Sequence, residues 1–68
     1  MRKDIENFYN DLNKLLKKEY PSLSVEFEKR IRTRSPKKIF IWLDNELKNK
    51  LFSLELNELL TDFFFSIH

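Results

Sequence analysis

The stretch Ser22-Leu-Ser-Val-Glu-Phe-Glu-Lys-Arg-Ile-Arg-Thr-Arg34 alternates between two kinds of side chain along most of its length. One side of the alternation carries Leu23, Val25, Phe27, Ile31 and Thr33. The other side carries Ser24, Glu26, Glu28, Arg30, Arg32 and Arg34. A period of two with β-branched residues is typical of a strand that buries one face. We therefore predict a strand over residues 22–34. Lys29, which interrupts the apolar side, indicates an edge strand.

The residues that follow predict the rest of a sheet. Ser35-Pro36 is a turn signal, and because the chain contains no glycine, we expect a hairpin loop of about three to five residues. Ile39 to Leu43 is apolar on both sides, which is typical of a central strand covered on both faces. We favour a short third strand at Lys50-Leu51-Phe52, because a two-stranded ribbon is marginal. The alternative is a helix that begins at Glu46, among good helix formers.

Two amphipathic helices are expected to flank this sheet. In residues 4–19 the apolar side chains recur at helical spacing, Asp4 can act as the N-cap, and Pro21 ends the helix. The apolar stripe of this helix consists of Ile5, Phe8, Tyr9, Leu12, Leu15 and Leu16. Ser53 is a suitable N-cap for a final helix over residues 54–66. Its core stripe consists of Leu56, Leu59, Leu60, Phe63, Phe64 and Ile67.

The predicted fold is therefore a single α+β domain over residues 1–68. A small three-stranded antiparallel sheet is flanked by N- and C-terminal helices in the order α-β-β-β-α. The alternative order is α-β-β-α with a long C-terminal helix. A chain this short buries only about 60% of its unfolded surface, so its stability margin is thin and it would gain from dimerising or from binding a partner.

The sequence offers little for catalysis, for metal binding or for a membrane. The only histidine is the last residue, His68, and the chain has no cysteine and no glycine-rich loop. Glu46-Leu47-Lys48 matches half of a metal-dependent nuclease site, but no upstream aspartate motif accompanies it. Glu26 and Glu28 would share a strand face without further ligands. We expect no enzyme, no metal and no small-molecule cofactor. The N-terminus lacks the apolar segment of a signal peptide and no apolar run approaches about 20 residues, so we expect a cytoplasmic protein.

Charge is distributed unevenly along the chain. Residues 29–38 contain no acidic side chain but six basic ones, which are Lys29, Arg30, Arg32, Arg34, Lys37 and Lys38. Alternate residues of a strand lie about 6.6–6.8 Å apart, close to the phosphate spacing of a nucleic-acid strand. If Phe40 and Trp42 share the arginine face, they add a stacking platform for unpaired bases. The alternative is that both side chains belong to the core, because a slip of one residue reverses the faces of a strand.

These patterns predict a small non-enzymatic binding module that contacts an anionic partner, nucleic acid first, through a basic β-hairpin. The rival interpretation is a protein-binding inhibitor, antitoxin-like partner or regulatory subunit that uses its aromatic C-terminal helix and the same hairpin against an acidic protein surface. Phe63-Phe64-Phe65 makes the apolar band of that helix wide. Phe64 and Phe65 are therefore candidate interface residues for a protein partner or a homodimer.

Overall fold

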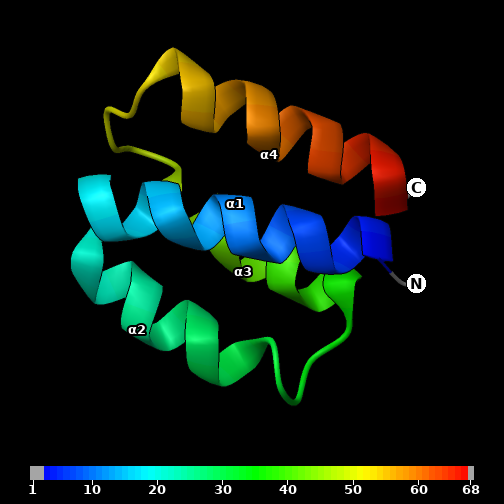
Figure 1. The fold of residues 1–68 in the computed structure, drawn as a ribbon. Coiled ribbons are helices and arrows are strands. Elements are labelled where there is room, and N and C mark those ends of the chain that lie inside the picture. The colour runs from blue at the N-terminus through cyan, green and yellow to red at the C-terminus, as the bar shows by residue number, and fades with distance from the viewer. Residues whose placement is uncertain (1–2, 68) are drawn as a thin grey trace.

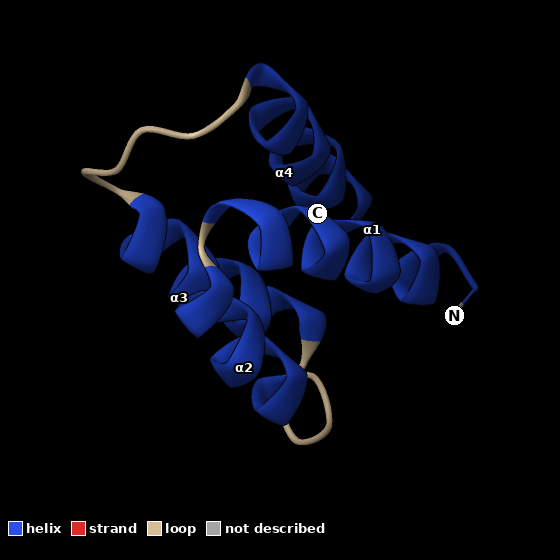
Figure 2. Ribbon diagram, turned by 60° about the vertical axis from the view of Figure 1, so that its left-hand side comes forward, coloured by secondary structure: helices blue, strands red, loops and turns tan. Residues whose placement is uncertain are grey.

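The computed structural model describes residues 3–67, with side chains from residue 5 onward. Four helices, and no strand, form within these residues (Figure 1). The helices are α1 (Lys3–Glu19), α2 (Pro21–Arg30), α3 (Pro36–Leu47) and α4 (Leu54–Ile67). α1 lies between α2 and α4 and also passes in front of α3 in this view (Figure 1). Figure 2 shows the two loops that separate α2 from α3 and α3 from α4.

The predicted α+β class is therefore wrong, and so are the three-stranded sheet and the basic β-hairpin. Most of the predicted strand 22–34 lies in α2, and the rest forms the turn that follows it. The predicted central strand Ile39–Leu43 lies inside α3. The segment Lys50–Phe52, proposed as a third strand, is loop. The alternative with a long C-terminal helix is wrong as well, since α4 begins only at Leu54.

α2 is a helix because its first and last residues both favour one. Pro21 occupies the first turn, where its missing N–H and its fixed φ angle cost nothing. Lys29 and Arg30 fall in the last turn, where cations are favourable beside the helix dipole. Glu26 and Arg30 are four residues apart and form an ion pair on the helix surface. The alternating pattern is overridden, and Val25 is left 54% exposed.

α3 begins where a hairpin turn was predicted. The Ser35 hydroxyl accepts a hydrogen bond from the backbone N–H of Lys38 at 3.4 Å, and Pro36 follows in the first turn. Ser-Pro thus acts as an N-cap followed by an N1 proline. Ile39, Leu43 and Leu47 recur every four residues and are buried, so the apolar run is a buried helix face and not a central strand.

The two terminal helices are confirmed. α1 and α4 match the predicted ranges 4–19 and 54–66 within one residue at each end. Ser53 caps α4 as predicted, because its hydroxyl accepts a hydrogen bond from the backbone N–H of Leu56 at 3.0 Å. The predicted cap Asp4 lies outside the described side chains, and His68 lies outside the described residues.

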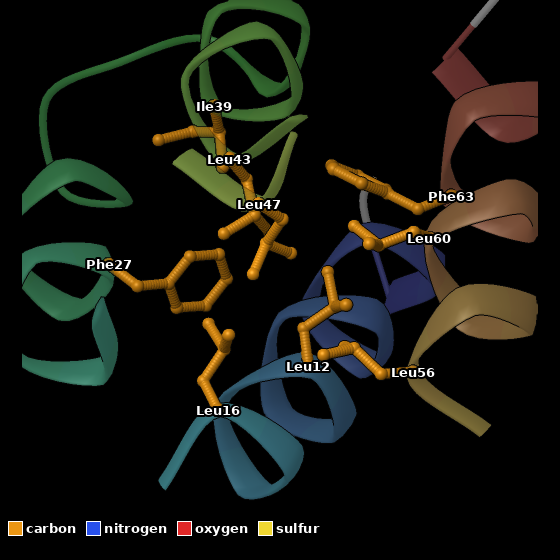
Figure 3. Packing of buried hydrophobic residues seen from close by; sticks show 9 residues of the cluster. All are labelled: Leu12, Leu16, Phe27, Ile39, Leu43, Leu47, Leu56, Leu60 and Phe63. Carbon is orange, nitrogen blue, oxygen red and sulfur yellow. The ribbon is translucent and has the colours of Figure 1, made fainter. Parts of the chain in front are cut away.

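All four helices contribute to one apolar core (Figure 3). Its buried side chains are Leu12, Leu16, Phe27, Ile39, Leu43, Leu47, Leu56, Leu60 and Phe63. Tyr9 packs edge-on against both Phe27 and Phe63, with ring centroids 5.7 and 5.8 Å apart. Such aromatic pairs add stabilisation beyond the burial of area, which suits a chain with little volume to bury.

Hydrogen bonds between polar side chains hold neighbouring helices together. Ser24 of α2 is buried and donates to the Asn13 side-chain carbonyl of α1 at 2.6 Å, while the Asn13 amide donates to Glu28 at 2.8 Å. At the C-terminal end of α1, the Glu19 carboxylate accepts hydrogen bonds from the backbone and side chain of Ser53. Among residues 3–67, no helix is long and apolar enough to cross a membrane.

Candidate functional site

The six basic residues of the 29–38 stretch gather where α2 ends and α3 begins. Lys29 and Arg30 form the last turn of α2, Arg32 and Arg34 lie in the connecting turn, and Lys37 and Lys38 lie in the first turn of α3. We call these six residues the basic corner. Figures 1 and 2 both show this connection at the end of the molecule opposite to α4.

Two of the six cations are held by contacts within the fold. Arg30 donates from Nη1 to Glu26 at 2.6 Å, and its guanidinium carbon lies 4.5 Å from the centroid of the Trp42 ring. Lys29 Nζ lies 3.9 Å from the other carboxylate oxygen of Glu26. The Arg30 hydrogen bond and the charge of Lys29 lower the pKa of Glu26. Arg30 thus links α2 to α3 and is less available to a partner.

The other four cations project into solvent. Arg32, Arg34, Lys37 and Lys38 are exposed, and none of them forms an ion pair with any residue that the structure describes. The Arg34 guanidinium donates to the neighbouring Thr33 hydroxyl at 3.3 Å. Lys37 and Lys38 stand beside the positive end of the α3 dipole, and the first turn of α3 contains no acid. Positive potential is therefore concentrated at the corner, although Glu28 of α2 lies near enough to interact with the charge of Arg32.

The structure does not place Phe40 and Trp42 on one face. The two residues are two positions apart on a helix, so a rotation of about 200° about the helix axis separates the directions of their side chains. Phe40 faces α4 and packs against Phe63 and Phe64, with centroids 6.2 and 5.0 Å apart. Trp42 faces α2 and lies under Arg30. Both pack against the core, so the two rings do not form a shared stacking platform beside the arginines.

Phe64 and Phe65 lie together on α4, with ring centroids 5.6 Å apart. Phe65 is 70% exposed. Both rings line an open groove of about 450 Å³ between α3 and α4, together with Phe40 and Phe52. We call this the aromatic groove. It lies away from the turn that carries Arg32 and Arg34, but Phe40, which was predicted to bind an anionic partner, lies in this groove with Phe64 and Phe65.

A second groove, which the sequence did not predict, lies between α1 and α4. It has a volume of about 420 Å³ and is lined by Asp11, Lys14, Leu15, Glu55, Glu58, Leu59 and Asp62. We call it the acidic groove. Acidic residues recur at helical spacing at positions 55, 58 and 62, and this is the sequence pattern that could have predicted an acidic face on the last helix. Only the packing of α4 against α1 brings Asp11 to the same place.

The described residues contain no cluster of potential metal ligands. Among them, no three His, Cys, Asp or Glu side chains come close enough to hold a metal ion. Glu26 and Glu28 do not share a face, because they lie on a helix. Glu26 pairs with Arg30, whereas Glu28 turns toward α1, where hydrogen bonding by Asn13 and the charge of Lys17 lower its pKa.

Comparison with protein-family models, with curated proteins and with solved structures finds no match to this chain.

Proposed function

We propose that this protein is a small non-enzymatic module that binds an anionic partner, nucleic acid first, through the basic corner. The observation that carries the proposal is a set of four exposed cations on one turn and the adjoining helix end, none of which forms an ion pair within the described part of the chain. These are Arg32, Arg34, Lys37 and Lys38. Polyanions attract such clusters, because each phosphate that is neutralised releases condensed counterions. A cytoplasmic location, where nucleic acid is accessible, belongs to the same proposal.

The contacts favour recognition of phosphates over recognition of bases. Phe40 is packed on α4 and Trp42 is covered by Arg30, so neither ring is presented for stacking beside the corner. Contacts to phosphates position a protein on nucleic acid but carry little sequence information. We therefore propose binding that depends strongly on salt and weakly on base sequence, and that accepts a duplex without unpaired bases.

Arg30 acts in this proposal as a positioning residue. Its bond to Glu26 and its contact with Trp42 fix the last turn of α2 against α3. The turn that carries Arg32 and Arg34 starts directly after that fixed point. Holding both ends of the turn reduces the conformational entropy that a flexible basic segment would lose on binding.

The test is a charge reversal at the corner, measured by fluorescence anisotropy with a labelled DNA duplex of about 20 base pairs at low salt. Arg32→Glu/Arg34→Glu should weaken binding at least about tenfold, because it replaces two phosphate-binding cations with repelling anions. Lys14→Glu/Lys18→Glu is the matched control, since it changes the net charge equally on exposed α1 positions. Circular dichroism checks that both variants fold.

The proposal predicts a large loss for the corner variant and a small one for the control. Equal losses would show that net charge alone matters, and the basic corner would not be the binding surface. Unchanged binding by Arg32→Glu/Arg34→Glu would refute the proposal directly.

A protein-binding role is the second candidate, and one observation favours it. Phe65 is 70% exposed beside the aromatic groove and contacts Phe64, so it belongs to a larger apolar surface and is not an isolated exposed side chain. An inhibitor, an antitoxin-like partner or a regulatory subunit would use this surface and could use the basic corner as well. Formation of a homodimer through α4 is the third outcome that the same rings allow.

A further inference from the structure

α4 is a ridge with a groove on each side. The aromatic groove separates it from α3 and the acidic groove separates it from α1. In Figures 1 and 2 the side of α4 that points away from α1 is not covered by any other helix. This uncovered side of α4 and the two grooves beside it form one continuous surface, which we call the α4 surface.

The α4 surface exposes more apolar area than an isolated surface residue would. Leu54 is 71% and Phe65 is 70% exposed. They are eleven residues apart, so on an α-helix they point within about 20° of each other and lie about 16 Å apart along its axis. Phe64, which contacts Phe65, extends the apolar area into the aromatic groove. Asn57, Glu58 and Thr61 are exposed between Leu54 and Phe65 on this face, so the two apolar side chains are separate anchors about three turns of a partner helix apart.

Acids outnumber cations on the α4 surface. α4 contains Glu55, Glu58 and Asp62 and no lysine or arginine, and Asp11 of α1 adds a fourth acid to the acidic groove. Among the described residues, Lys14 also lines the acidic groove, and Asp44 and Lys48 line the aromatic groove. Pairing of α4 with α4 of a second copy would bring acids against acids, which is unfavourable. Charge complementarity therefore selects a cationic occupant.

We propose that the α4 surface docks a cationic amphipathic helix of another protein. Apolar side chains spaced at i, i+3/i+4 and i+7 would enter the aromatic groove and cover Phe65 and Leu54. Lysine or arginine side chains on the flank of that helix would reach Glu58 and Asp62. The basic corner lies at the other end of the molecule, so the module can hold a polyanion and a basic protein at the same time.

The proposal does not rest on nucleic-acid binding, and its test uses a different probe. The probe is a fluorescein-labelled peptide of leucine and lysine, about 14 residues long, with leucines at helical spacing. One control peptide has the same composition in scrambled order, and a second carries glutamate in place of lysine. Binding is followed by anisotropy at about 150 mM salt, where weak long-range attraction is screened.

The amphipathic peptide should bind at least about tenfold more tightly than either control peptide. Phe65→Ser and Glu58→Lys/Asp62→Lys should each weaken it at least about tenfold, since both change exposed residues of the proposed contact. Glu6→Lys is the control for charge, and it changes the net charge by half as much as the double variant. Glu6 is exposed on the side of α1 that carries Asn13 and Lys17, away from the acidic groove.

Three results would overturn the proposal. Equal binding of the scrambled peptide would mean that charge alone attracts the probe. An equal loss in Glu6→Lys and in Glu58→Lys/Asp62→Lys would place the contact elsewhere. Failure to bind the peptide, with concentration-dependent self-association in analytical ultracentrifugation that Phe65→Ser abolishes, would assign the surface to a second copy of the chain.

Discussion

At the scale of single residues, Ser53 and Glu19 join parts of the chain that are far apart in sequence. The Ser53 hydroxyl donates to Glu19 at 2.5 Å and accepts from the backbone N–H of Leu56 at 3.0 Å, while the Ser53 N–H donates to Glu19 at 2.8 Å. Beside them, the Tyr20 hydroxyl donates to the backbone carbonyl of Leu51. These contacts hold the C-terminal end of α1 against the α3–α4 loop and the start of α4.

The Glu19 contact gives the fold a dependence on acid. Its hydrogen bonds from the side chain and backbone of Ser53 lower the pKa of Glu19. Because the folded pKa lies below the unfolded one, the contribution to stability is fully present above the ordinary value of 4.5. It is lost as pH falls through the folded pKa. Glu26 and Glu28 act in the same direction.

Glu19→Gln tests this dependence. We expect the variant to be less stable than the parent at neutral pH, and to lose less further stability on acidification, because the introduced amide cannot take up the proton. The measurement is the urea midpoint by circular dichroism at pH about 6 and about 3. Some acid sensitivity should remain, since Glu26 and Glu28 are unchanged. An identical drop in the midpoint for both proteins would contradict the role given to Glu19.

At the scale of elements, α3 distinguishes a helix from a strand most sharply. In a strand, residues 39, 41 and 43 would share one face. In α3, Ile39 and Leu43 are fully buried, whereas Ile41 is 61% exposed. The apolar run that suggested a central strand therefore contains one residue that the fold does not bury.

Two alanine substitutions test that difference. Leu43→Ala should destabilise the protein by about 2–4 kcal/mol, because it leaves a cavity among buried side chains, and in a domain this small it can abolish folding. Ile41→Ala should cost less than about 1 kcal/mol, because its side chain is mostly in water. Thermal unfolding of both variants gives the answer. Similar losses at the two positions would favour the strand and contradict α3.

The terminal helices could be predicted from the sequence because their apolar residues repeat at a period that only a helix satisfies. The α2 region was ambiguous for a simple reason. Leu23, Phe27 and Ile31 are four residues apart, and a spacing of four fits both a period of two and a period of 3.6. Lys29 interrupts the apolar side of the alternation. We interpreted it as a feature of an edge strand, but it was evidence against a strand. It shares an exposed helix face with Val25.

The sequence also indicated which residues form the basic corner but not which of them stay exposed. Arg30 is covered because helical spacing brings Glu26 to it and tertiary packing brings Trp42. The contact of Arg30 with Glu26 can be predicted once α2 is known to be a helix, because the two residues are four positions apart. The contact of Arg30 with Trp42 depends on how α2 and α3 pack, just as the position of Asp11 beside α4 depends on how α1 and α4 pack. No local pattern encodes that packing.

At the scale of the whole molecule, charge is separated between two ends. The basic corner lies at the α2–α3 connection, and α4 with its acids lies on the opposite side of the molecule (Figure 1), where Asp11 of α1 joins them in the acidic groove. The net charge is only +2, but the positive and negative charges are concentrated on different sides of the molecule. Such a field orients the protein as it approaches a polyanion, with the acidic end pointing away. That end then remains accessible for a second partner.

The salt dependence of duplex binding tests the central claim most directly, because it counts the phosphates that the corner neutralises. Four exposed cations predict a slope of log K against log salt of about −3 to −4, and a roughly 100-fold loss of affinity between 50 and 200 mM salt. Arg34→Gln should make the slope shallower by about 1, and Lys14→Gln should leave it unchanged. A slope that Arg34→Gln does not alter, or binding that salt does not weaken, would contradict the account.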